Sequence, residues 1–255
     1  MTLLKANQLS KVFGGLKAVS SFDVEINDGE LIGLIGPNGA GKTTAFNLLT
    51  GVYEPTTGDI VFDGKSVVGL KPFQITQRGI ARTFQNIRLF SELSVLDNVK
   101  IAYHFHVKYG LLESVLRIGR YHNEEEEIEQ KAIKFLDVFK LTHKKDEIAK
   151  NLPYGEQRRL EIARALAAQP KLLLLDEPAA GMNPQETQEL MDMIRWIRKE
   201  FNLTILLIEH DMSLVMGVCE RIYVLEYGSI IAHGTPQEIK NNPRVIEAYL
   251  GEEVH

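Results

Sequence analysis

The chain has 255 residues and is 44% hydrophobic, which is enough to bury the core of one large domain or of a domain with a subdomain. Its formal net charge of −5 argues against a protein whose main partner is nucleic acid. The single cysteine, Cys219, excludes an internal disulfide, and its apolar surroundings favour a packed thiol over a nucleophile. The N-terminal residues lack the features of a signal peptide, and no apolar run is long enough to span a bilayer. We therefore expect a soluble protein, and if it works at a membrane, it does so through a partner.

The first part of the chain predicts strands. Residues 3–9 and 20–26 alternate between apolar and polar side chains, and residues 27–30 (Asn-Asp-Gly-Glu) are typical of a hairpin turn. Between the two strands, Phe13 stands beside two glycines. Such a ring is suited to stacking on a nucleotide base, a contact worth about 1–3 kcal/mol, although taken alone it is more often part of the core.

An apolar run at residues 31–35 predicts a strand, and a glycine-rich loop and a helix follow it. The loop fits the pattern G-x-x-x-x-G-K-[ST], in which glycines let backbone N–H groups face a phosphate and the new helix adds the positive end of its dipole. Lys42 is placed to reach the β- and γ-phosphates, and the Thr43 hydroxyl to ligate Mg²⁺. The predicted nucleotide-binding residues here are Gly36, Pro37, Asn38, Gly39, Ala40, Gly41, Lys42, Thr43 and Thr44.

The next segment predicts short elements. Residues 51–59 form a turn-rich break, residues 60–65 a strand with a tight turn, and a helix begins near residue 72. A short strand within residues 79–85 brings Gln85 to its end, where the side chain would lie near Mg²⁺ and its water. A surface glutamine is the alternative, and the spacing alone favours it.

From about residue 87 to residue 165 the pattern is mostly helical. The acidic run Glu124 to Glu127 favours the solvated start of a helix over a metal site, and Glu127 pairs with Lys131 at i, i+4. Residues 151–166 read as a loop with a glycine that leads into a helix, an anion-binding geometry. Because that loop has no lysine, it would be half of a site that another subunit completes. The apolar residues behind the acidic run share one helical face: Ile128, Ala132, Phe135, Leu136 and Phe139.

Two apolar strands are predicted to end in polar residues. Residues 172–175 lead to Asp176 and Glu177, which cannot share one role because consecutive strand residues point to opposite faces. Asp176 suits Mg²⁺, and Glu177 suits the polarisation of an attacking water. Residues 204–208 likewise lead to His210, which we expect to contact the γ-phosphate and that water.

The C-terminal part predicts a hairpin and helices. Residues 221–225 and 229–232 flank a turn at residues 226–228. A short helix is expected after residues 235–236, and residues 247–250 close the pattern. The chain shows no internal repeat and no low-complexity linker.

Taken in order, these motifs resemble the ATP-binding subunits of ABC transporters, and the resemblance covers essentially the whole chain. It implies an α/β fold: a RecA-like P-loop core with an antiparallel β-subdomain and an inserted α-helical subdomain. It implies one domain over residues 1–255, with the core and β-subdomain at 1–86 and 166–240, the helical subdomain at 87–165 and a tail at 241–255. The landmarks are Phe13 for the base, the phosphate loop Gly36 to Thr43, Gln85, the signature segment (Leu152, Pro153, Tyr154, Gly155 and Glu156), the strand ending at Asp176, the D-loop (Ala180, Gly181, Met182 and Asn183) and His210.

The resemblance also implies how the protein works. Two subunits pair head to tail, as a homodimer or as a heterodimer with a second ATPase, so that each ATP lies between the phosphate loop of one and the signature segment of the other. Glu177, His210 and Gln85 would be catalytic, and Thr43, Gln85 and Asp176 would hold Mg²⁺. ATP hydrolysis would drive transport through two membrane permeases at the cytoplasmic face of the inner or plasma membrane. An extracytoplasmic solute-binding protein would take part indirectly, and no nucleic acid would be bound.

The chain departs from the family pattern at a few positions. Pro153 replaces the usual signature serine, which removes a hydroxyl and an N–H donor. Tyr154 replaces a glycine, Glu156 a glutamine, and Asn183 the usual aspartate of the D-loop. We interpret these as subfamily traits because Lys42 and the catalytic residues are intact.

Residues 82–90 look very like those of bacterial and archaeal importers of branched-chain amino acids (the Liv family), as does the ending at residues 232–252. The ATPase of lipopolysaccharide export has a similar ending and is the nearest alternative. A non-transport ABC ATPase fits the acidic balance less well. The signature loop argues against a P-loop kinase, and the intact catalytic residues argue against a regulatory module without turnover. Within this resemblance, Ile87, Leu89 and Phe90 are expected to help form a groove that faces the permeases.

Overall fold

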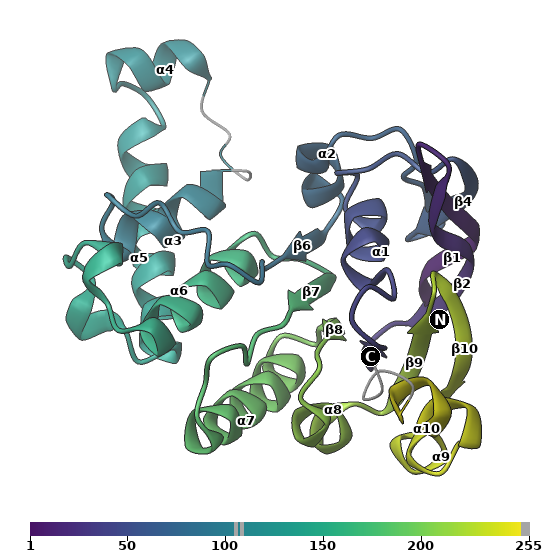
Figure 1. The fold of residues 1–255 in the computed structure, drawn as a ribbon. Coiled ribbons are helices and arrows are strands. Elements are labelled where there is room, and N and C mark those ends of the chain that lie inside the picture. Colours follow the sequence, from purple (N-terminus) through teal and green to yellow (C-terminus); the bar gives the residue numbers. More distant parts are fainter. Residues whose placement is uncertain (105–106, 108–109, 251–255) are drawn as a thin grey trace. The chain divides into compact units, whose positions relative to one another are not determined.

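The structure is a computed structural model that describes residues 1–104, 107 and 110–250 (Figure 1). The chain divides into two compact units, one formed by residues 1–82 and 171–255 and the other by Thr83–Pro170. The predicted helical subdomain at 87–165 falls within the second unit, and the functional division of the chain stays a prediction. Residues 251–255, part of the predicted tail and of the ending that resembles the importers, lie outside the described residues.

The first unit contains two sheets. The smaller sheet is antiparallel, with the strand order β2-β1-β4-β5. The larger sheet has the order β10-β9-β3-β8-β7-β6 and is parallel except for the β9–β10 hairpin at its edge. The strands are β1 (Thr2–Phe13), β2 (Leu16–Asn27), β3 (Leu31–Ile35), β4 (Thr57–Phe62), β5 (Lys65–Ser66), β6 (Ile80–Arg82), β7 (Leu172–Asp176), β8 (Thr204–Ile208), β9 (Arg221–Glu226) and β10 (Ser229–Gly234) (Figure 1).

The predicted hairpin turn at residues 27–30 is wrong. The hairpin between β1 and β2 turns instead at Gly14 and Gly15, whose φ angles are +50° and +100°. Residues 27–30 lead from β2 into β3, which belongs to the other sheet. β3 is buried along its whole length and has parallel neighbours on both sides, β8 and β9, so it offers no edge to an antiparallel partner.

The remaining elements expected in this unit are present. The helix near residue 72, the hairpin with its turn before Ser229 and the helix that starts at Pro236 are confirmed. The hairpin makes β9 the last parallel strand of the larger sheet. The helices of the unit are α1 (Lys42–Leu49), α2 (Pro72–Gln77), α7 (Pro184–Glu200), α8 (Met212–Val218), α9 (Pro236–Lys240) and α10 (Pro243–Leu250) (Figure 1).

The core of the first unit joins both sheets to α1. Phe22 of β2, Phe46 of α1 and Phe62 of β4 are fully or almost fully buried in one apolar cluster. Cys219 is also buried and free, and burial raises the pKa of its thiol above the ordinary value. The interpretation of Cys219 as a packed thiol is therefore confirmed.

The second unit is helical. α5 begins at Tyr121, before the acidic run, and buries Ile128, Ala132 and Leu136 on one face, as predicted. Lys131 Nζ lies 2.5 Å from Glu127 Oε1, which confirms the predicted i, i+4 pair. The elements are α3 (Val95–Tyr103), α4 (Leu111–Leu116), α5 (Tyr121–Val138), the 3₁₀ turns η2 (Thr142–Lys144) and η3 (Ala149–Asn151), and α6 (Tyr154–Ala167).

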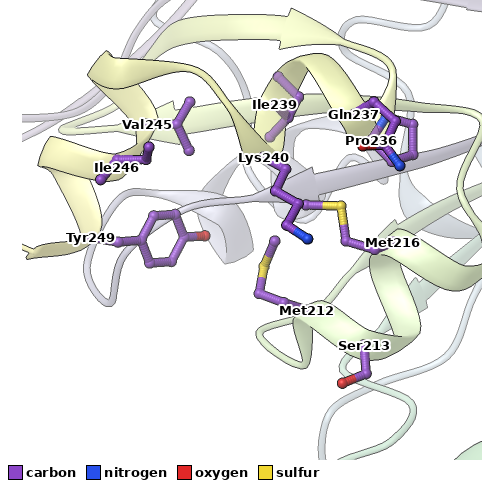
Figure 2. A pocket seen from close by; sticks show the side chains of 10 residues that line it. All are labelled: Met212, Ser213, Met216, Pro236, Gln237, Ile239, Lys240, Val245, Ile246 and Tyr249. Carbon is purple, nitrogen blue, oxygen red and sulfur yellow. The ribbon is translucent and has the colours of Figure 1, made fainter.

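Helices α8, α9 and α10 surround a cavity in the first unit. Its volume is about 630 Å³, and Met212, Met216 and Ile239 contribute to its mostly apolar lining, with Lys240 beside them (Figure 2). Among the described residues, no helix combines the length and the apolar character needed to cross a membrane. The other lining residues are Ser213, Pro236, Gln237, Val245, Ile246 and Tyr249.

Candidate nucleotide-binding site

Three neighbouring strands of the larger sheet bring the predicted site residues to one edge. β3, β8 and β7 are adjacent and parallel, so the segments after their carboxyl ends lie next to one another. The glycine-rich loop follows β3, His210 follows β8, and Glu177 follows β7. Open α/β sheets bind their ligands outside the carboxyl ends of the strands, which makes this edge the candidate site.

Two glycines are required by the path of the loop after β3. Gly36 has a φ angle of +154°, and a Cβ atom there would lie 2.0 Å from the carbonyl oxygen of Leu225. Gly41 has a φ angle of +104°, and a Cβ atom there would lie 2.5 Å from the carbonyl oxygen of Ala18. Both obstructing atoms belong to the backbone and not to a flexible side chain, so any side chain at these positions would displace the main chain.

Lys42 stands at the C-terminal end of the loop, and its side chain bonds back to the first residues of the loop. Its Nζ donates to the carbonyl oxygens of Gly36 at 2.6 Å and Pro37 at 2.9 Å, and only 8% of the residue is exposed. α1 starts at this lysine, directly after Gly41, and its first turn contains no acidic residue. The first-turn N–H groups have no partner within the helix, so this end of α1 favours an anion. A phosphate here would meet a buried ammonium and the positive end of the helix together.

Asp176 ends β7 and is only 4% exposed. Its Oδ2 accepts a hydrogen bond from Arg82 Nη2 at 2.6 Å, across the pairing of β6 with β7. The sequence predicts that Asp176 binds Mg²⁺ and indicates no role for Arg82. The carboxylate is therefore at the predicted edge, with a buried cation beside it.

Glu177 and His210 come together as predicted. Glu177 Oε2 lies 3.8 Å from Nδ1 of His210, and the side chain of Glu177 is 18% exposed while that of His210 is 64% exposed. Glu177 has a φ angle of +45°, an uncommon conformation for a residue other than glycine. Its N–H donates to the carbonyl oxygen of Ile208 at 2.9 Å, which fixes the turn at the end of β7.

Glu209 is a further residue of the site that the sequence analysis missed. It is fully buried, and its carboxylate accepts hydrogen bonds from the N–H groups of Ala179 at 2.8 Å, His210 at 3.0 Å and Asp211 at 3.3 Å. Burial raises the pKa of this carboxyl above its ordinary value, although the three donors favour its charged form. Glu209 thus ties the segment after Glu177 to the segment that carries His210. The signal in the sequence is a carboxylate directly after the apolar run at residues 205–208.

The D-loop leads from Glu177 into α7. Its Ala180, Gly181 and Met182 form a turn in which the N–H of Met182 donates to the carbonyl oxygen of Ala179 at 3.0 Å. Asn183 caps α7, because its Oδ1 accepts hydrogen bonds from the N–H groups of Gln185 and Glu186, both at 3.0 Å. Asparagine and aspartate cap helices about equally well, so the departure at Asn183 keeps this local function.

Gln85 belongs to the second unit. The preceding strand ends at Arg82, so Gln85 does not stand at a strand end as predicted. Its backbone is held by a fully buried arginine: Arg158 donates to the carbonyl oxygens of Phe84 at 2.7 Å and Gln85 at 2.8 Å, and to Glu161 at 2.8 Å. The buried Arg158–Glu161 pair therefore connects the Gln85 segment to α6.

The signature segment forms the start of α6. Pro153 is the N-cap, and the helix begins at Tyr154, so Gly155 lies in its first turn and not in a preceding loop. The Glu156 carboxylate lies 2.7 Å from Lys144 Nζ, while Tyr154 is 46% exposed. An anion at this helix start would meet backbone N–H groups and Tyr154, with Glu156 held by the lysine. Leu152, by contrast, is buried.

Phe13 lies at the surface and is 40% exposed, so it is not the core residue that its sequence position alone favours. Its ring stacks edge-on with Tyr53 at 5.2 Å between centroids, and Lys11 Nζ lies 5.1 Å from its centre. An exposed, supported ring of this kind is compatible with base stacking.

The residues of the first unit also fit Mg²⁺. The Thr43 hydroxyl and the Asp176 carboxylate are hard oxygen donors of the kind that Mg²⁺ prefers. In the described part of the chain there is no group of three or more His, Cys, Asp or Glu residues that could hold a metal alone. Proteins usually bind Mg²⁺ through one or two side chains together with substrate phosphates, so these two donors would hold it together with the phosphates of a bound nucleotide.

Comparison with known proteins places the chain in a family. Residues 19–180 match the ABC transporter family, and residues 229–255 match the family of the branched-chain amino acid ATP-binding cassette transporter. The chain is 50% identical to LivG of Salmonella typhimurium, a high-affinity branched-chain amino acid transport ATP-binding protein, over 98% of both chains. It is 38% identical to LptB of Escherichia coli, a lipopolysaccharide export system ATP-binding protein, over 99% of both chains.

The fold agrees with these matches. A crystal structure of an ATP-binding cassette of an ABC transporter in its ADP conformation superimposes with a TM-score of 0.85 at 32% identity, over 98% of this chain and 99% of that one. The predicted fold and the predicted resemblance are both confirmed. The higher identity to LivG and the C-terminal match decide against the lipopolysaccharide-export alternative. The chain therefore belongs to the ABC transporter family, as an ATP-binding protein of the branched-chain amino acid type.

Proposed function

We propose that this cassette binds ATP with Mg²⁺ at the edge formed by β3, β8 and β7, and that its hydrolysis of ATP drives the uptake of branched-chain amino acids. The observation that carries the proposal is the meeting of the phosphate loop, the Asp176–Glu177 pair and His210 at this edge. The loop and Lys42 would bind the phosphates, and Phe13 would support the base. Mg²⁺ would neutralise charge on the phosphates, held by Thr43 and Asp176.

Glu177 is the proposed base. Its carboxylate is partly exposed beside His210, so it can accept a proton from a water molecule at the γ-phosphate. His210 would orient that water and contact the γ-phosphate, and Glu209 would keep both segments in place through their backbone N–H groups. Gln85 keeps the catalytic role that the family resemblance implies for it.

The helix start at Leu152 to Glu156 is the reason to propose that two cassettes pair to form each ATP site. It offers backbone N–H groups to an anion but no lysine of its own loop, so we propose that it completes the ATP site of a second cassette, identical or different. Two permeases would receive the resulting movement, with a solute-binding protein supplying the amino acid from outside. The cassette would then lie at the cytoplasmic face of the membrane.

The test is Glu177→Gln in the complete transporter. Removal of a general base typically costs about 10²–10⁴-fold in rate, whereas the amide keeps the shape of the side chain, so ATP binding should persist while turnover is lost. The control is Glu200→Gln, which changes an exposed glutamate at the end of α7. ATP hydrolysis at the wild-type rate in Glu177→Gln would exclude the proposed mechanism. Uptake of leucine, isoleucine and valine into proteoliposomes tests the proposed substrates.

A further inference from the structure

The guanidinium of Arg82 is fixed by several contacts. Its Nη2 donates to Asp176 Oδ2 at 2.6 Å, and its Nη1 donates to Asn47 Oδ1 at 2.7 Å and to Thr50 Oγ1 at 3.4 Å. Its Cζ atom lies 5.4 Å from the centre of the Phe46 ring. Phe46 and Asn47 belong to α1, and Thr50 is the C-cap of that helix. Arg82 thus joins the carboxylate at the end of β7 to the helix that carries the phosphate loop.

The free energy of folding does not by itself account for the buried ion pair between Arg82 and Asp176. The side chains of Arg82 and Asp176 are 7% and 5% exposed, and a buried ion pair costs so much desolvation that an apolar pair of similar size is often as stable. The strands do not need the pair either, because β6 and β7 are already joined by backbone pairing, with Arg82 opposite Leu174. The buried Asp176 carboxylate is therefore better explained by a ligand that it binds than by a contribution to stability.

We propose that Arg82 is a positioning residue for the metal: it fixes Asp176 through Oδ2 and so sets the orientation in which the carboxylate meets Mg²⁺ or its water. The inference rests on the proposed role of Asp176 as a Mg²⁺ ligand. Groups that hydrogen-bond a metal ligand typically contribute 10- to 100-fold to metal affinity. Arginine suits the task because its rigid fork holds Asp176 and Asn47 at the same time.

The positive charge of Arg82 has the opposite effect on Mg²⁺ affinity, and two substitutions separate the two effects. Arg82→Met removes both the charge and the fork, whereas Arg82→Lys keeps the charge and loses the fork. If positioning dominates, both variants bind Mg²⁺ more weakly. If charge repulsion dominates, Arg82→Met binds Mg²⁺ more tightly and Arg82→Lys resembles the wild type.

The experiment measures the binding of a fluorescent ADP analogue to the purified full-length chain as Mg²⁺ is added, and again in EDTA. For both Arg82 variants we expect the Mg²⁺ concentration at half-maximal effect to rise at least about tenfold. Binding in EDTA should change less than twofold, which a general loss of structure would not allow. The matched control is Arg78→Met, which removes an exposed guanidinium that donates to the carbonyl oxygen of Ser66 at 3.3 Å, and should leave the midpoint unchanged.

Two further variants keep the outcome decisive. Asn47→Ala leaves Arg82 and Asp176 in place but removes one anchor of the fork, so it should raise the midpoint by less, even if the Arg82 variants do not fold. Asp176→Asn should abolish the response to Mg²⁺; if it does not, the proposed role of Asp176 fails. If Asp176→Asn loses the response to Mg²⁺ but Arg82→Met has a normal or lower Mg²⁺ midpoint, the proposed role of Arg82 is wrong. The proposed role of Asp176 would still stand.

Discussion

The buried pair between Arg158 and Glu161 predicts a large loss of stability from a single substitution in the second unit. Both side chains are closed to solvent, at 0% and 1% exposure. Glu161 also accepts hydrogen bonds from the N–H groups of Phe84 at 3.4 Å and Arg88 at 3.1 Å. In Arg158→Met the Glu161 carboxylate would stay buried without its cation, and two carbonyl oxygens of the Gln85 segment would lose their donors.

The size of the effect follows from the burial. Removing one partner of a buried ion pair typically destabilises a protein by about 3–5 kcal/mol. At roughly 2–4 °C per kcal/mol for a chain of this size, the melting temperature should fall by about 6–20 °C. The double variant Arg158→Met/Glu161→Leu should recover much of the loss, because it removes the stranded charge as well.

The assay is thermal unfolding of the purified chain followed by calorimetry, with hydrogen exchange of residues 84–88 as a local measurement. The matched control is Arg159→Met on the same helix, whose partner Glu156 is 3.8 Å away and whose side chain is 33% exposed, so it should cost no more than about 1 kcal/mol. We expect faster exchange at residues 84–88 in Arg158→Met and not in the control. Equal melting temperatures for the two single variants would refute the reasoning from burial.

Two other predictions concern segments whose roles the resemblance suggests. Replacing Ile87, Leu89 and Phe90 with alanine should reduce the stimulation of ATP hydrolysis by permeases while leaving the activity of the cassette alone unchanged; unaltered stimulation in proteoliposomes would remove these residues from the proposed groove. Asn183→Asp should leave the stability of α7 unchanged and Asn183→Ala should lower it by about 0.5–2 kcal/mol, as measured by chemical denaturation, because only alanine loses the cap. A loss of the same size in both variants would contradict the assignment of the cap.

The parts of the site that the sequence predicted are those with local signals. The phosphate loop combines fixed glycines, Lys42 and a helix start within a few residues, and the Asp176–Glu177 pair and His210 stand at the ends of apolar runs. The fold was predicted through the family resemblance that these motifs carry. The hairpin turn was misplaced because residues 27–30 and the Gly14–Gly15 pair both have turn chemistry, and only the burial of β3 decides between them.

The supporting residues were missed because their partners are remote in the chain. Arg82 and Asp176 are 94 residues apart, and Arg158 is 74 residues from Phe84. A charged residue in a short strand or a helix looks like a surface residue until the fold brings its partner to it. The Glu156 carboxylate shows the same limit, because its contact with Lys144 depends on how η2 packs against the start of α6.

The cavity among α8, α9 and α10 offers a route to small molecules that are selective for this kind of cassette. Compounds aimed at the phosphate loop compete with ATP at a motif that many unrelated ATPases share. The cavity has a different origin: three of its lining residues come from α8, and the others lie within residues 229–255, the segment that matches the branched-chain cassettes (Figure 2). α8 is capped by Asp211, the neighbour of His210. An inhibitor shaped to this cavity would therefore bind through residues of the branched-chain type while contacting the helix that begins beside His210, the proposed catalytic histidine.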